Sequence, residues 1–138
     1  MRSLLLVDDT KSDEKLALLA IAASGIEVAT TVARDGQEAL DRLLGGASGP
    51  PMAVPHLVLL DLNLPKVGGL EVLRLARADA RTRHVPIVIF SSAAEPADVV
   101  RSSELGANGF VSKPAGFDEL ADTVKTTMTF WLMLHRRV

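Results

Sequence analysis

Short apolar runs alternate with amphipathic segments along the chain, and this alternation constrains the fold more than any other feature. Five runs are too short for helices and rich enough in apolar side chains to be strands buried on both faces. These runs are Leu4–Val7, Ile26–Thr31, Leu57–Leu60, Ile87–Phe90 and Gly109–Ser112. The intervening segments have helical patterns over Lys11–Ala23, Gly36–Leu44, Leu70–Ala78, Pro96–Leu105 and from about Phe117 to about His135. This order predicts an α/β fold, a five-stranded doubly wound parallel sheet with helices on both faces.

The composition agrees with one compact domain over residues 1–138. Apolar residues make up 48% of the chain and charged residues 23%, which excludes a disordered protein. The net charge of −2 gives no overall field that would draw the chain to nucleic acid or to a membrane. The chain has no cysteine, so disulfides and thiolate metal sites are excluded. It has neither a signal peptide nor an apolar stretch of roughly 20 residues that could span a membrane, and we expect a cytoplasmic protein.

Polar side chains follow four of the predicted strands at the point where each strand ends. Asp8 and Asp9 follow the first strand, and Asp61 follows the third. Ser91 follows the fourth strand and Lys113 the fifth. Ligands of open parallel sheets bind at the carboxyl ends of the strands. We therefore expect these carboxylates, the hydroxyl and the ammonium to meet at one edge of the sheet.

Three neighbouring carboxylates would repel one another, and a hard divalent cation such as Mg²⁺ would relieve that repulsion. A metal-bound carboxylate cluster beside a lysine and a serine suits a phosphoryl group. Asp61 is the best candidate for a nucleophile that forms an aspartyl phosphate, because it stands alone at the centre of the sheet. Asp8 and Asp9 are paired and better suited to hold metal, although they could instead only cap the first helix.

The segments LLLVDD, LVLLDLNLPKVGG, PIVIFSSA and GANGFVSKP resemble, in this order, the motifs of bacterial response-regulator receiver domains. The resemblance covers nearly the whole chain. It implies the strand order 2-1-3-4-5, which is also the order of flavodoxin-like folds. It further implies that Asp61 accepts a phosphoryl group from the phosphohistidine of a sensor histidine kinase.

The resemblance also implies how the metal is held. Asp9 would bind Mg²⁺ directly and Asp8 mostly through water. The backbone carbonyl of Asn63 would be a further ligand, beside Asp61 itself.

Other residues are implied to sense the phosphoryl group. Ser91 stands where the family has a switching Ser or Thr, and Phe110 where it has a switching aromatic residue. Lys113 would be the charge partner of the phosphoryl group, and the peptide bond between Lys113 and Pro114 is expected to be cis. The phosphorylated protein would then shift between two conformations.

The C-terminal segment Phe130–Leu134 is apolar at five consecutive positions. A helix that lies on its own domain needs one apolar stripe, which Leu120, Val124, Met128 and Trp131 supply. Phe130, Met133 and Leu134 remain on the outward-facing side and predict a homodimer contact, in which Trp131 is also expected to take part. The alternatives are a tail that folds back on its own domain, or an arm that crosses a partner. The ending is similar to that of single-domain regulators paired with phytochrome-type sensor kinases.

The sequence as a whole predicts a stand-alone receiver without an output domain, which is not an enzyme acting on other substrates. One alternative is a pseudo-receiver that serves only as a protein-binding scaffold, although all five site residues are present. The other is a phosphatase of the haloacid-dehalogenase type. Such an enzyme needs an acid two residues after its nucleophile, where this chain has Asn63.

Ala93 generates a prediction about the lifetime of the phosphorylated form. Fast-dephosphorylating receivers often have a polar or acidic residue two positions past the switching hydroxyl, and a methyl group cannot guide an attacking water. We expect slow loss of phosphate, which Ala93→Glu should accelerate. The decay of the phosphorylated species can be followed by intact mass, and equal decay in the two proteins would contradict the prediction.

Overall fold

The fold is a five-stranded parallel sheet, seen in a computed structural model that describes residues 1–92 and 95–134. The strands lie in the order β2-β1-β3-β4-β5, and every neighbouring pair is parallel. Their bounds are Arg2–Val7 (β1), Val28–Ala33 (β2), Leu57–Leu60 (β3), Ile87–Ser91 (β4) and Gly109–Ser112 (β5). The predicted fold class and the strand order implied by the resemblance are both confirmed.

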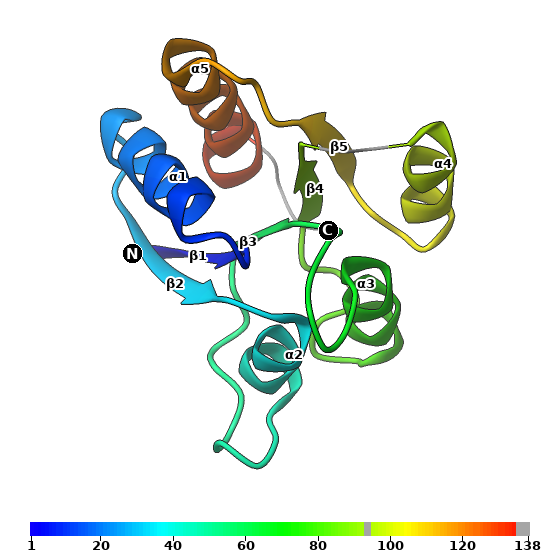
Figure 1. Cartoon of the computed structure of the whole chain (residues 1–138). Coiled ribbons are helices and arrows are strands. Elements are labelled where there is room, and N and C mark those ends of the chain that lie inside the picture. Colours follow the sequence, from blue (N-terminus) through cyan, green and yellow to red (C-terminus); the bar gives the residue numbers. More distant parts are fainter. Residues whose placement is uncertain (93–94, 135–138) are drawn as a thin grey trace.

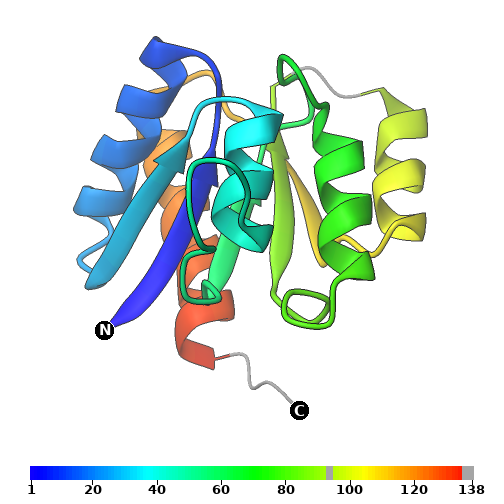
Figure 2. The same cartoon turned by 90° about the horizontal axis from the view of Figure 1, so that it is seen from below.

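Helices cover both faces of the sheet (Figures 1 and 2). Helices α1 (Lys11–Ala23) and α5 (Phe117–Met128) pack together on one face. Helices α2 (Gly36–Leu44) and α3 (Gly69–Ala78) pack on the other, and α4 (Pro96–Glu104) lies beside α3 and β5. Within residues 1–92 and 95–134, no helix is both long and apolar enough to cross a membrane.

Two apolar cores result from the alternation of side chains along the buried strands. Leu5 and Leu60 belong to the core beneath α2 and α3, whereas Leu4 and Leu59 belong to the core beneath α1 and α5. All residues of β3 and β4 are buried, as expected for the centre of a parallel sheet covered on both sides. The central strands therefore fix rigidly where the residues that follow them emerge.

Strand β2 begins and ends two residues later than the sequence pattern predicts. The sequence pattern indicated Ile26–Thr31, whereas β2 covers Val28–Ala33. Ala33 pairs with Val7, the last residue of β1, and its carbonyl accepts a hydrogen bond from the Asp8 amide. Pairing with β1 therefore sets the end of β2, and the apolar Ile26 packs against the α1–α5 core without joining the sheet.

The C-terminal helix differs from its predicted form. The α-helical part ends at Met128 and continues as a π-helix, η1 (Thr129–Leu134), while His135 lies outside the described residues. Leu132 takes the buried position after Met128, and Trp131 is only partly buried. The wider turn of a π-helix explains this change, because it moves the inward position one residue further along the chain. Three other side chains point outward as predicted, namely Phe130, Met133 and Leu134.

The packing of η1 predicts unequal effects of two leucine substitutions. Leu132 is 4% exposed and Leu134 is 67% exposed. Leu132→Ala should lower the free energy of unfolding by about 2–4 kcal/mol, because it leaves a cavity in the α1–α5 core. Leu134→Ala, the matched control, should change it by less than about 0.5 kcal/mol in the monomer. Urea unfolding at low protein concentration measures both, and equal losses would show that η1 does not pack as described.

Candidate functional site

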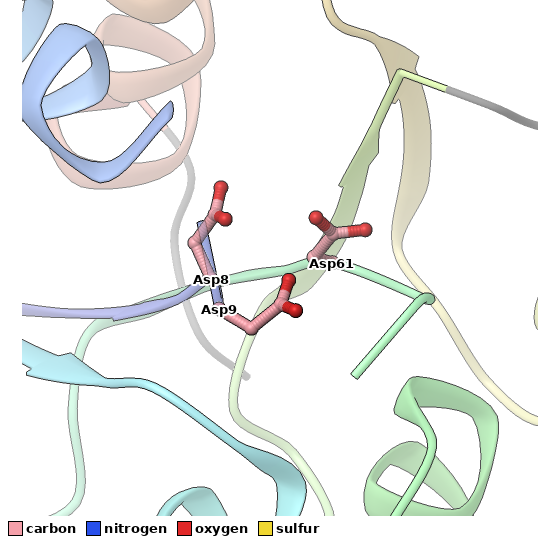
Figure 3. A group of neighbouring side chains, drawn as sticks. All are labelled: Asp8, Asp9 and Asp61. Carbon is pink, nitrogen blue, oxygen red and sulfur yellow. The ribbon is translucent and has the colours of Figure 1, made fainter. Parts of the chain in front are cut away.

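The sheet brings three carboxylates together at the carboxyl ends of β1 and β3 (Figure 3). Oxygen atoms of Asp8, Asp9 and Asp61 all lie within 4.8 Å of one another. Asp8 and Asp61 are buried, at 2% and 7% exposure, and Asp9 is exposed. The two strands are direct neighbours, and their last residues, Val7 and Leu60, are paired. The predicted cluster is therefore formed by the pairing of the central strands.

Lys113 joins the ends of three strands. Its Nζ donates to Oδ2 of Asp8 at 2.6 Å and to Oδ2 of Asp61 at 3.2 Å. Its side chain is only 9% exposed, and its Nζ also lies 5.8 Å from the centre of the Phe90 ring. The Lys113 amide donates to the Ser91 carbonyl at 3.0 Å, which extends the pairing of β5 with β4. The Lys113 ammonium group is thus held in a fixed position between two buried carboxylates.

The second oxygen of Asp61 is held by a hydroxyl and an amide. Ser91, the last residue of β4, is fully buried, and its Oγ donates to Oδ1 of Asp61 at 3.2 Å. The Asn63 amide donates to the same oxygen at 3.2 Å. Both carboxylate oxygens of Asp61 therefore have fixed partners, and Asn63 is tied to the site through its own backbone.

Burial and charge act in opposite directions on the ionisable groups. Burial raises the pKa of the Asp8 carboxyl above its ordinary 3.8, and hydrogen bonds from Lys113 and Thr10 offset this only in part. Burial also disfavours the charged form of Lys113. The hydrogen bond to Asp8 and the charge of Asp61 together outweigh that effect, so the pKa of Lys113 is raised above 10.5. The lysine stays cationic, while the Asp8 carboxylate carries a cost of desolvation.

The donor set fits a hard divalent cation. It offers oxygen atoms of three carboxylates, two buried and one exposed, within 4.8 Å of one another, and hard cations prefer oxygen ligands. One ammonium group cannot neutralise three carboxylates, so the site keeps an excess of negative charge.

Helix capping does not account for Asp8. Helix α1 begins after Thr10, whose side chain makes no capping hydrogen bond. Oδ1 of Asp8 accepts from the Thr10 amide at 3.1 Å, before the helix, and its other oxygen binds Lys113. A true carboxylate cap occurs at α2, where Asp35 accepts from the Glu38 amide at 2.7 Å.

Three further predicted features have different outcomes. Phe110, in β5, is partly buried against the α2–α3 core. The peptide bond between Lys113 and Pro114 is trans, so the predicted cis bond is wrong. The trans form is the one favoured for most X–Pro bonds, by about 0.5–1 kcal/mol, and Lys113 reaches its carboxylate partners with it. Ala93 lies outside the described residues.

Asp13 belongs to the surroundings of the site and was missed from the sequence. Its Oδ2 lies 3.7 Å from Nζ of Lys113, and its side chain is 39% exposed. It follows Asp9 by four residues, in the first turn of α1. The available signal was an acidic residue in the first turn of the helix that directly follows Asp8 and Asp9.

The response regulator receiver domain family matches residues 4–125 of the chain. Response regulator Rcp1 of Synechocystis sp. is 33% identical over 129 residues, which cover 94% of this chain and 88% of Rcp1. A crystal structure of the Mn²⁺-bound form of Rcp1 superposes with a TM-score of 0.89, covering 100% of this chain and 99% of that one.

Two other solved structures are similar over nearly their full lengths. The phosphorylated cyanobacterial phytochrome response regulator RcpA is 34% identical, with a TM-score of 0.88 and coverage of 98% of this chain and 96% of RcpA. The bacteriophytochrome response regulator AtBRR is 42% identical, with a TM-score of 0.77 and coverage of 99% of each chain. With the family match and the geometry of the site, these similarities show that the chain belongs to the response regulator receiver domain family.

Proposed function

We propose that this chain is a phosphorylation switch in which Asp61 accepts a phosphoryl group from the phosphohistidine of a sensor histidine kinase. The observation that carries the proposal is the buried Lys113 ammonium, which contacts Asp8 and Asp61 while the Ser91 hydroxyl contacts the other oxygen of Asp61. These groups surround one carboxylate with the donors that a phosphoryl group requires.

Asp8, Asp9, Asp61 and the backbone carbonyl of Asn63 would hold a Mg²⁺ ion. The oxygen-only cluster supports a hard cation, and the relative Rcp1 has a Mn²⁺-bound form. When bound, the cation would neutralise carboxylate charge and the developing charge of the phosphoryl oxygens. Following the resemblance, Asp9 would bind directly and Asp8 mostly through water.

The transfer itself needs no further side chain of this protein. A carboxylate oxygen of Asp61 attacks phosphorus, the new P–O bond forms, and the P–N bond of the phosphohistidine breaks with its electron pair returning to the imidazole. Lys113 and Ser91 already lie 3.2 Å from the oxygens of Asp61, so short movements would bring them to the phosphoryl oxygens. The reaction modifies the protein itself, and we propose no other substrate.

The added charge would then change the conformation. Ser91 would bond to the phosphoryl group, and Phe110 would repack in response. Because Ser91 and Phe110 lie in adjacent strands, β4 and β5, a shift of one can be passed to the other through the sheet. This is a population shift between two states, biased by a local change of charge.

A kinase of the phytochrome type is the partner that the relatives suggest, since RcpA and AtBRR are described as phytochrome response regulators. A cavity of about 310 Å³ opens beside Lys113, where such a partner could approach. Leu16 and Phe117 line it and are each 40% exposed.

A cytoplasmic location is part of the proposal, because the phosphohistidine of a sensor kinase is formed from ATP.

We further propose that residues 1–138 act as one receiver domain that forms a homodimer through its C-terminal segment. The supporting observation is the outward-facing apolar surface of η1, where Phe130, Met133 and Leu134 are 49%, 52% and 67% exposed. Trp131 borders it in an edge-to-face contact with Phe130, with ring centres 4.8 Å apart. Clustered exposed apolar side chains of this size favour association.

Incubation with Mg²⁺ and acetyl phosphate tests the site. The wild type should gain the mass of one phosphoryl group, and Asp61→Asn should gain none, because an amide cannot replace the carboxylate as nucleophile. Chelation of Mg²⁺ should abolish the gain in the wild type. A wild type that stays unmodified under these conditions would favour the scaffold alternative and contradict the proposal.

The same samples test the dimer by sedimentation velocity. The wild type should sediment as a dimer, and a variant with Phe130→Ser and Met133→Ser as a monomer. The variant should still gain the phosphoryl mass, because η1 does not contact the carboxylates. A wild type that stays monomeric in both phosphorylation states would rule out the homodimer.

The raised pKa of Asp8 gives a prediction on stability. Because this pKa is higher in the folded than in the unfolded chain, Asp8 favours folding below its unfolded pKa near 3.8, and this contribution is lost as the pH rises through the folded pKa. At pH 7 without metal, Asp8→Asn should therefore raise the Tm, since the Lys113 ammonium keeps its contact with Asp61. The difference should shrink as the pH falls toward 4.

In the presence of Mg²⁺ the wild type should have the higher Tm of the two proteins. Mg²⁺ should raise the Tm of the wild type, since a cation that binds only the folded state stabilises it, and it should raise the Tm of Asp8→Asn far less. Asp122→Asn, which removes an exposed carboxylate on α5, is the control and should change neither value. A metal-free Asp8→Asn protein less stable than the wild type at pH 7 would contradict the stated cost of the buried carboxylate.

A further inference from the structure

The loop between Asp61 and α3 is held in place by the first turn of α2. This loop, residues 62–68, carries Asn63, whose carbonyl is a metal ligand under the function proposed above. Figure 1 shows the loop passing close to the start of α2. The two segments are far apart in the sequence, so their contact has to be explained by tertiary structure.

Gly36 is the point of closest approach. A β-carbon at this position would lie 1.7 Å from the Val67 carbonyl oxygen and 2.5 Å from its carbonyl carbon. The Gly36 amide also donates to the Pro65 carbonyl at 3.3 Å. The contact is between two backbones, so no side-chain rotation could relieve a substituent there.

Lys66, between these two contacts, has an unfavourable backbone conformation. Its φ is 68°, and the Val67 amide donates to the Pro65 carbonyl at 2.8 Å across it. This is a tight γ-turn of the strained kind, which persists only where the surroundings impose it. The Lys66 ammonium lies 3.4 Å from Oδ2 of Asp35, the residue that caps α2.

Gly69 fixes the other end of the loop. A β-carbon there would lie 2.3 Å from the Asp61 carbonyl oxygen and 2.7 Å from the Leu62 α-carbon. The Gly69 amide donates to the Leu62 carbonyl at 3.0 Å. The loop therefore closes tightly on itself behind Asp61, and its backbone is in contact with α2 at Gly36.

We infer that Gly36 is a positioning residue for the metal site: its bare backbone lets the start of α2 hold the strained loop where the Asn63 carbonyl reaches the cation. The inference rests on the proposed function. It also means that the metal site and α2 are mechanically linked, so that a displacement of either would be felt by the other.

Gly36→Ala tests the inference directly. The new methyl group must push the loop away from α2, so the affinity for Mg²⁺ should fall by about tenfold or more, as is usual when groups that orient metal ligands are lost. Titration calorimetry with Mg²⁺ alone measures it, in buffer where circular dichroism shows the variant to be folded. Hydrogen exchange of the Leu64 and Gly69 amides in metal-free protein should become faster.

Gly68→Ala is the matched control. It makes the same change from glycine to alanine, here within the loop itself, but a β-carbon at Gly68 meets nothing within 4 Å, and the backbone φ of −69° suits alanine. This variant removes a favourable N-cap residue of α3 and so controls for general destabilisation. Its affinity for Mg²⁺ should equal that of the wild type.

Lys66→Gly covers the case in which Gly36→Ala does not fold. Glycine accepts the turn conformation without strain, and its flexibility loosens the loop by a change within the loop itself, without altering α2. This variant should fold, exchange its loop amides faster and bind Mg²⁺ more weakly. Wild-type affinity in folded Gly36→Ala, or in Lys66→Gly where Gly36→Ala does not fold, would overturn the inference alone. A wild type that binds no Mg²⁺ would overturn the proposed function with it.

Discussion

The site depends on one interaction, the contact of the buried Lys113 ammonium with the carboxylates of Asp8 and Asp61. Each of the three residues follows the end of a different strand. The distances from Nζ of Lys113 to the two carboxylates therefore depend on how β1, β3 and β5 are aligned in the sheet. A buried ion pair gains little stability, because desolvation offsets most of the attraction, but removal of Lys113 would leave two buried carboxylates without a counter-charge. The arrangement therefore adds little net stability, and it defines where a further anion and a cation would bind.

The surroundings of this contact divide into a rigid part and a strained part. Asp8, Asp61 and Ser91 lie on or directly after central strands whose residues are buried, so their positions follow from the packing of the sheet. The loop that follows Asp61 lies outside the sheet, and the backbone on either side of its strained turn at Lys66 contacts Gly36 of α2. Strain of this kind concentrates at functional sites. Helix η1 lies at the opposite end of the sheet from the carboxyl ends of the strands (Figure 2). Any influence of the site on a dimer must therefore pass through the core.

Much of this could be predicted from the sequence, for physical reasons that differ between elements. The runs before Asp61 and Ser91 could be identified because central parallel strands are apolar throughout, and the place where each strand ends fixes the site residue. The start of β2 could not, because Ile26 is apolar for packing rather than for pairing. The π-helical turn after Met128 depends on tertiary contacts that a periodicity of 3.6 residues does not contain. Gly36 carries no chemistry of its own, and its contact with Val67 exists only once the fold brings the two backbones together.

Of the three clustered carboxylates, Asp61 is the one proposed to form the acyl phosphate. Borohydride reduces an acyl phosphate to the corresponding alcohol, so treatment of the phosphorylated protein followed by peptide mass spectrometry identifies the modified residue. We expect homoserine at position 61 and unmodified aspartate at positions 8, 9 and 13. Reduction at Asp8 or Asp9 instead, with Asp61 intact, would contradict this expectation.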